Sequence, residues 1–151
     1  MPKHRSAADL QQMFRGTLSD VLGMRMAEVD SERVVMTHPG VATTADLHVV
    51  TAVLAESAGS AVAVLAAQPR DAVGIELSIT HYPRTAVGEI TAVATLLDAT
   101  DAVLACAISI SDAAGSPLAE ARLQCMARNL RRVAEAETVA AGAAEAETAA
   151  G

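Results

Sequence analysis

One carboxylate stands in the middle of the least polar stretch of the chain. Residues Leu47–Ala67 carry a single charge, that of Glu56, and Ser60 follows it four residues later. At this spacing the two side chains share one face of a helix and can act on the same atom. A carboxylate can activate water as a general base or attack a carbonyl carbon as a nucleophile. Its burial among apolar groups is costly unless it is paired, protonated or placed in a site, so Glu56 is the first candidate for chemistry.

Two other interpretations of this stretch stay open. About 20 apolar residues suffice to span a membrane. This stretch, however, is built on Ala, holds a glutamate near its centre and has no flanking basic cluster. Glu56 could also be a structural carboxylate neutralised by an arginine that the sequence does not identify. We expect neither and predict no membrane partner.

The composition indicates one globular domain followed by a tail. The chain has 151 residues, of which 52% are hydrophobic, enough for a real core. Its formal net charge of -7 argues against a nucleic-acid partner, for which a basic face is expected. After Arg132 the sequence becomes a near-repeat of Ala, Glu and Thr. We therefore predict a domain over residues 1–132 and a largely disordered tail over residues 133–151.

The two cysteines do not indicate a metal or redox site. Cys106 and Cys125 are far apart in sequence and lack metal-ligand or redox spacing. Because both fall in apolar segments, we expect reduced core residues and no metal. The N-terminal residues lack the apolar run of a signal peptide, so a cytoplasmic location is the expectation.

The hydrophobic spacing predicts an α+β fold. Ser6 begins a capping box with Asp9, and one amphipathic helix should run from there to Gly23. Leu47–Ala67 should form a long helix, capped by Thr44 or Asp46 and surrounded by the rest of the chain. Segments typical of strands are Met24–Val29, Arg33–Thr37, Ala72–Tyr82, Gly88–Asp98, Val103–Ser111 and Pro117–Arg128. One helix and one sheet hide each other only if the sheet curls around the helix.

Several motifs in this order resemble a known family. They are Leu54-Ala55-Glu56-Ser57-Ala58-Gly59, Ala72-Val73-Gly74, Thr80-His81-Tyr82 with Pro83-Arg84, and Gly88-Glu89-Ile90. Together they are similar to the hotdog-fold acyl-CoA thioesterases of the PaaI and 4-hydroxybenzoyl-CoA types. The resemblance covers roughly residues 18 to 128. It implies a curved antiparallel sheet wrapped around one long central helix, with a short N-terminal helix.

The resemblance also implies a site. Glu56 matches the catalytic carboxylate, and Ser60 matches a hydroxyl that holds the water or the carboxylate. Where the family has His-Gly-Gly, this chain has Leu47-His48-Val49. Backbone N–H groups of His48 and Val49 are then expected to hold the oxyanion, and the bulkier helix start predicts a slow or unusually selective enzyme. The predicted substrate contacts are Asp46, Leu47, Tyr82, Arg84 and Met24. The acyl pocket is expected to consist of Met24, Leu22, Met26 and the first helix.

The expected activity is hydrolysis of an acyl thioester of coenzyme A or a carrier protein, with no cofactor beyond the coenzyme A of the substrate. The family's site lies between protomers, so we expect a homodimer at least and a homotetramer as the larger assembly. A dyad of Asp46 and His48 beside Glu56 would instead suit a dehydratase, isomerase or cyclase on the same fold. A third alternative is a hotdog protein that binds acyl ligands without catalysis and retains Glu56 as a packed remnant.

Overall fold

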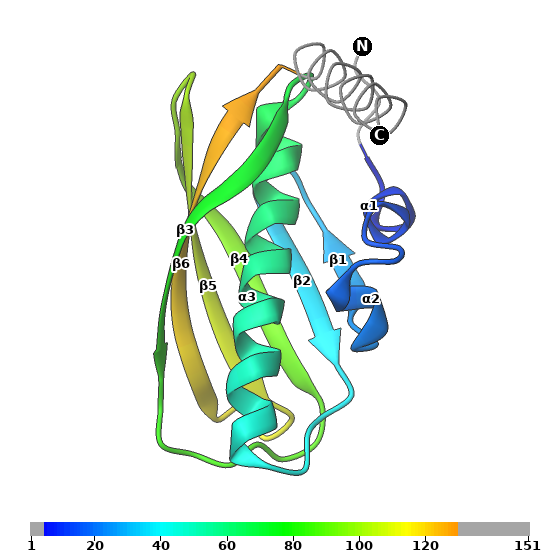
Figure 1. Cartoon of the computed structure of the whole chain (residues 1–151), viewed down its shortest axis with the longest axis vertical. Coiled ribbons are helices and arrows are strands. Elements are labelled where there is room, and N and C mark those ends of the chain that lie inside the picture. Colours follow the sequence, from blue (N-terminus) through cyan, green and yellow to red (C-terminus); the bar gives the residue numbers. More distant parts are fainter. Residues whose placement is uncertain (1–4, 130–151) are drawn as a thin grey trace, which may run out of the picture.

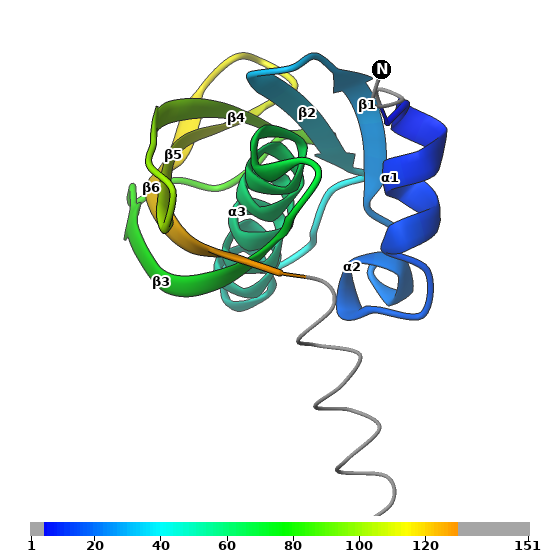
Figure 2. The same cartoon turned by 90° about the horizontal axis from the view of Figure 1, so that it is seen from above.

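The computed structural model describes residues 5–129 as one antiparallel sheet curved around one long helix (Figures 1 and 2). The helices are α1 (Ala7–Met13), α2 (Leu18–Val21) and α3 (Thr44–Ala67). The strands are β1 (Arg25–Val29), β2 (Arg33–His38), β3 (Asp71–His81), β4 (Ile90–Ala99), β5 (Val103–Asp112) and β6 (Pro117–Arg128). Their order across the sheet is β1-β2-β4-β5-β6-β3. The tail predicted over residues 133–151 lies outside the described residues.

The strands form where period-two alternation predicts them, because one face of the sheet packs on α3. Along β5, for example, Leu104, Cys106, Ile108 and Ile110 are buried, while the residues between them are less so. In β6 the alternate residues Leu123 and Cys125 face the same core. The sheet and α3 therefore share one core, composed largely of Ala, Val, Leu and Ile.

Gly59 lets α3 lie close to the middle of the sheet. A Cβ at this position would be 2.7 Å from Cδ2 of Leu123 and 3.2 Å from Cδ1 of Ile108. The thiol of Cys106 lies 3.6 Å from the carbonyl oxygen of Gly59. A glycine in a helix normally costs stability, but here it removes the one side chain that would hold helix and sheet apart.

The N-terminal segment forms two short helices instead of the single predicted one. The capping box of Ser6 and Asp9 is present, as predicted. The first helix nevertheless ends at Met13, and Gly16 adopts a φ of 76° before Thr17 begins α2. The left-handed region favours glycine and interrupts a helix, so the prediction of one continuous helix to Gly23 is wrong.

The central helix begins earlier than predicted. Its N-cap is Thr43, whose hydroxyl oxygen accepts the N–H of Asp46 at 3.1 Å and whose hydroxyl donates to the Asp46 carboxylate at 2.6 Å. Neither Thr44 nor Asp46 is the cap residue, so that prediction is wrong. Among the described helices α3 is the one long and apolar enough to cross a membrane, but 67% of its most apolar window is buried inside the domain.

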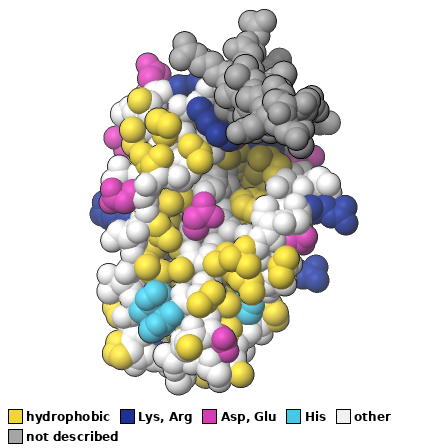
Figure 3. Space-filling view, viewed as in Figure 1, with side chains coloured by type: hydrophobic (Ala, Val, Ile, Leu, Met, Phe, Trp, Pro, Cys, Tyr) yellow, Lys and Arg dark blue, Asp and Glu magenta, His cyan; other side chains and the backbone are white. Residues whose placement is uncertain are grey.

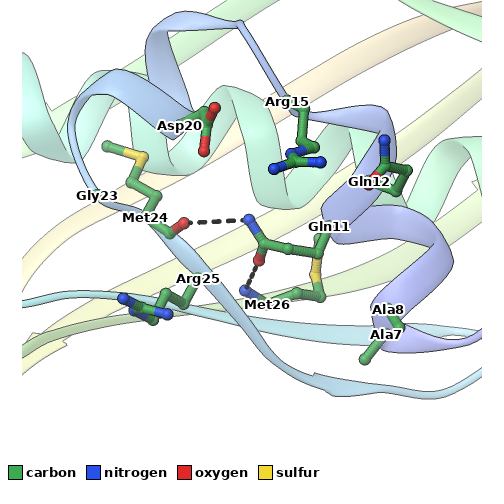
Figure 4. Close-up of a pocket in the computed structure, with 10 residues that line it drawn as sticks. All are labelled: Ala7, Ala8, Gln11, Gln12, Arg15, Asp20, Gly23, Met24, Arg25 and Met26. Carbon is green, nitrogen blue, oxygen red and sulfur yellow. Dashed lines mark hydrogen bonds between the residues drawn. The ribbon is translucent and has the colours of Figure 1, made fainter.

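The two edges of the sheet differ. Strand β1 lies against α1, and the side-chain amide of Gln11 forms two hydrogen bonds with the backbone of this edge (Figure 4). The amide oxygen accepts the N–H of Met26 at 2.7 Å, and the amide nitrogen donates to the carbonyl of Met24 at 3.4 Å. Strand β3 pairs with β6 on one side only, and no described strand lies on its other side. An open edge of 11 residues is a template for pairing with another chain.

We predict that Gly59→Ala lowers the free energy of unfolding. Overpacking a filled core costs about 1–3 kcal/mol, whereas alanine gains about 1 kcal/mol over glycine in a helix. Chemical denaturation of both proteins measures the difference. The loss of stability should be smaller in a Leu123→Val background, because this substitution shortens the side chain nearest to the added methyl group. Equal or higher stability of Gly59→Ala in the wild-type background would contradict the close packing.

Candidate active site

Glu56 lies on the one face of α3 that the sheet does not cover. The carboxylate is exposed, and Ala52 and Val53, one turn before it, are only partly buried. The prediction that the rest of the chain surrounds this helix is therefore wrong. The curved sheet covers one side of α3 and leaves a face open between β3 and α2 (Figure 2). The space-filling view shows apolar side chains around an isolated acidic group on this face (Figure 3).

Ser60 orients the Glu56 carboxylate. Its hydroxyl donates a hydrogen bond to Oε1 of Glu56 at 2.8 Å, as expected for side chains one helical turn apart. Gly74 of β3 lies beneath the pair: a Cβ there would be 3.4 Å from Oε1 of Glu56 and 3.9 Å from Oγ of Ser60. The Ser60 hydroxyl thus holds Oε1 of Glu56, and the missing side chain at Gly74 leaves the space beside this oxygen free.

The thiol behind this pair is not a nucleophile. Burial raises the pKa of the Cys125 thiol to about 11, with the charge of Glu56 acting in the same direction and a hydrogen bond to Ser60 opposing them. Burial likewise raises the pKa of Cys106 to about 12. Both cysteines are free and buried, as predicted. At neutral pH both thiols therefore stay protonated.

An apolar pocket of about 380 Å³ opens beside Glu56. Its lining residues come from the end of α1, from α2 and from the open face of α3: Phe14, Thr17, Leu18, Ser19, Ala52, Val53 and Glu56. A hydrogen bond of 2.5 Å between the buried hydroxyls of Ser19 and Ser57 ties α2 to α3 and fixes the floor of this pocket. The pocket places apolar volume next to a carboxylate, the arrangement that an acyl substrate needs.

The backbone N–H groups of His48 and Val49 do not fit their predicted role. Because the helix begins at Thr44, both residues lie in its second turn, where each N–H bonds to the carbonyl four residues earlier. The N–H groups that helix geometry leaves free are those of Thr44 and Ala45, since Asp46 donates to Thr43. Thr44 lines a separate pocket of about 230 Å³ at this end of the helix, with Leu47 and Thr85.

His48 stacks on His81, a histidine that the sequence analysis did not assign to the site. The two ring centroids are 4.2 Å apart. The hydroxyl of Thr51 donates to the carbonyl of Leu47 at 2.8 Å, so we assign Nε2–H of His81 as the donor in its 2.8 Å bond to Thr51. Asp46 bonds to Thr43 instead, and the predicted dyad of Asp46 and His48 is not formed.

The predicted substrate contacts are scattered. Met24 is buried and lines the cleft between α1 and β1 (Figure 4), and it is not among the residues that line the pocket beside Glu56, contrary to its predicted place. Leu47 is buried under the helix start. Tyr82 follows β3, and Arg84 is exposed in the next loop. Hydrogen bonds from three backbone N–H groups, that of Ser116 above all, lower the pKa of Asp112, and the charge of Arg84 adds a smaller effect in the same direction. None of these lines the pocket beside Glu56.

Solved structures match this arrangement. A thioesterase from Haemophilus influenzae, HI1161, superposes with a TM-score of 0.75 at 20% identity, over 85% of this chain and 94% of its own. A variant of thioesterase PA1618 from Pseudomonas aeruginosa superposes with a TM-score of 0.70 at 22% identity, over 85% of this chain and 98% of its own. The Escherichia coli PaaI protein superposes with a TM-score of 0.65 at 15% identity, over 78% of this chain and 88% of its own. The chain adopts the hotdog fold. No protein-family model matches the sequence, and no curated protein does.

Within the hotdog fold, some site residues escaped the sequence analysis. Gly74 carried a usable signal, because a glycine inside a strand marks a close approach. Phe14 and Leu18 belong to the N-terminal segment that the sequence analysis placed in the acyl pocket, although neither residue was named. Val53 carried no signal, since it resembles an ordinary core position of a helix. In the part of the chain that the structure describes, no three His, Cys, Asp or Glu side chains lie close enough together to hold a metal ion.

Two histidines should make this hotdog domain less stable in mild acid. Burial lowers the pKa of His38, despite a bond to the backbone of Leu22, and burial followed by the charge of His48 lowers the pKa of His81. The unfolded chain then binds protons that the folded chain does not. Stability is therefore full above the unfolded pKa near 6.5 and is lost as the pH falls below it.

Denaturation at several pH values between neutral and mildly acidic conditions tests this prediction. The double variant His38→Asn and His81→Gln removes both titrations. The first substitution keeps an acceptor for the Gly40 N–H, which Nδ1 of His38 accepts at 3.1 Å. The second keeps a donor for the hydroxyl of Thr51, because the new amide carries N–H groups. Stability of this variant should vary less with pH than that of the wild type. Equal pH dependence of the two proteins would show that neither histidine is responsible.

Proposed function

We propose that this chain hydrolyses an acyl thioester, of coenzyme A or of an acyl-carrier protein, and that Glu56 carries the reaction. The observation that supports this most directly is the position of the Glu56 carboxylate, hydrogen-bonded by Ser60 at the rim of an apolar pocket. The solved structures that resemble the chain include proteins named as thioesterases. Their identity of 20–22% supports the fold, and the activity rests on the site.

The free oxygen of Glu56 is the reacting atom in this proposal. Oε1 accepts the Ser60 hydroxyl, whereas Oε2 has no hydrogen-bond partner among the described residues. As a general base, Oε2 takes a proton from water while the water oxygen bonds to the thioester carbon. The C–S bond then breaks, and the proton returns to the departing thiolate. In the nucleophilic variant Oε2 itself attacks, and water hydrolyses the resulting anhydride.

The start of α3 cannot supply the oxyanion donors for Glu56 of the same chain. The free N–H groups at Thr44 and Ala45 are about 12 residues from Glu56, which is about 18 Å along a helix. They cannot hold the oxyanion of a carbonyl that Glu56 of the same chain activates. A second copy would have to bring an N–H donor to this carboxylate, which supports a site shared between protomers.

We propose a homodimer as the smallest active unit, with a homotetramer as the larger assembly. The open edge of β3 is a described surface that can pair with a second copy, whereas Gln11 occupies the β1 edge. A cytoplasmic location and the absence of a further cofactor belong to the same proposal. The dehydratase alternative has less support than the sequence indicated, because Asp46 bonds to Thr43 and not to His48.

Glu56→Gln should abolish most of the hydrolysis. Amides do not accept a proton at neutral pH, and a general base contributes about 10²–10⁴-fold to the rate. Thiol release from a panel of short, medium and aryl acyl-CoAs measures the loss, with Glu89→Gln, an exposed loop acid, as the matched control. His48→Ala should cost far less; a loss as deep as that of Glu56→Gln would favour the dehydratase or isomerase alternative. Activity retained by Glu56→Gln would show that Glu56 does not carry the reaction, and no thiol release by the wild type from any thioester, where a control thioesterase is active, would favour the dehydratase or the non-catalytic alternative.

Ile75→Lys should weaken the dimer and lower activity with it. Ile75 is 54% exposed on the open edge strand β3, and a lysine on an edge strand opposes pairing with another strand. Leu97→Lys, 49% exposed on β4, adds the same charge away from that edge and serves as control. Sedimentation at several protein concentrations reports the assembly. A wild-type monomer, or equal dissociation of both variants, would contradict assembly through β3.

A further inference from the structure

We propose, on the basis of the function inferred above, that the pocket beside Glu56 selects acyl groups made of plain hydrocarbon and rejects those that end in a carboxylate. The pocket is the one lined by Phe14, Leu18, Val53 and their neighbours on α2 and α3. Three properties of its lining carry the inference: hydroxyl groups that are already hydrogen-bonded within the protein, the lack of a basic group, and the position of Glu56 itself.

The hydroxyl groups in the lining already have partners. Thr17 donates its proton to the carbonyl of Phe14 at 2.6 Å, which closes the turn between α1 and α2. Ser19 is 4% exposed and shares its hydrogen bond with Ser57 at 2.5 Å. The remaining lining side chains, apart from Glu56, are apolar. A carboxylate at the end of the acyl chain would therefore gain no hydrogen bond from these groups to replace the water that it gives up on entering the pocket.

The charges around the pocket also disfavour an acyl group that ends in a carboxylate. Glu56 is the one ionisable residue among those that line this pocket, and its negative charge opposes a second carboxylate nearby. The nearest basic residue in sequence, Arg15, follows Phe14 but lines the other cleft, between α1 and β1, together with Arg25 (Figure 4). The connection between α1 and α2 thus separates an apolar pocket from a cleft that holds both arginines.

Two positions on α2 allow a test by gain of function. Leu18 lines the pocket and is 56% exposed, so an arginine there can reach the acyl group without burying its charge. Val21 lies on the same short helix, is 77% exposed and does not line the pocket. Leu18→Arg and Val21→Arg add the same charge to the same helix, and differ only in whether the guanidinium faces the bound acyl chain.

The experiment measures binding of two thioethers that cannot be hydrolysed, S-hexyl-CoA and S-(5-carboxypentyl)-CoA, by titration calorimetry at neutral pH. The wild type should bind the hexyl compound at least about tenfold more tightly, the loss expected for one unsatisfied buried acceptor. Leu18→Arg should reduce this ratio, and Val21→Arg should leave it as in the wild type. Equal affinities in the wild type, no binding of either compound, or equal effects of both arginines would each overturn the proposal.

Parallel assays with hexanoyl-CoA and adipoyl-CoA separate this inference from the proposed hydrolysis. Selective binding without thiol release from any thioester would remove the hydrolase function and leave the pocket assignment intact. Thiol release at similar kcat/KM from both substrates, with equal affinities for the two thioethers, would keep the hydrolase function and remove the selectivity.

Discussion

The contact between α3 and the middle of the sheet is the constraint on which the rest of the structure depends. Gly59 brings the helix against Leu123 and Ile108, so the sheet must curve around it to cover more than one side. Six strands in an open sheet cover part of the helix and leave one face uncovered. The same close packing brings Gly74 of β3 under Glu56 and Ser60. Core packing and the geometry of the site therefore have a common cause.

The strands were predictable because the sheet has one face packed against α3, which imposes a period of two that is clearest in β4, β5 and β6. Strand β6 has the predicted bounds, and the other strands differ by one or two residues at one or both ends. The helix boundaries were harder to predict than the strands. The break at Gly16 depends on a backbone conformation that hydrophobic spacing does not report, and the cap at Thr43 had two competitors of similar chemistry within three residues.

The open face of α3 could not be predicted from the sequence. Apolar or small residues stand on every side of this helix, so no amphipathic pattern distinguishes the covered face from the exposed one. The sequence therefore predicted that protein surrounds Glu56 on all sides, whereas in the structure its carboxylate is exposed at the edge of a pocket. The pairing of Glu56 with Ser60 was predictable, because it depends only on a spacing of four within one helix. His48 and His81 are far apart in sequence, and only the tertiary fold brings them together.

The start of α3 changes the meaning of the motif that differs from the family's. The sequence places Leu47-His48-Val49 where His-Gly-Gly is expected, and a β-branched residue there would crowd an oxyanion bound at the helix terminus. With the helix beginning at Thr44, however, the unbonded N–H groups of Thr44 and Ala45 precede this motif by two to three residues. The side chain of Val49, 55% exposed, then lies beside the open face and not over those N–H groups. The missing glycines therefore do not by themselves obstruct these N–H groups, and the structure gives no reason to expect a slow enzyme from this motif alone.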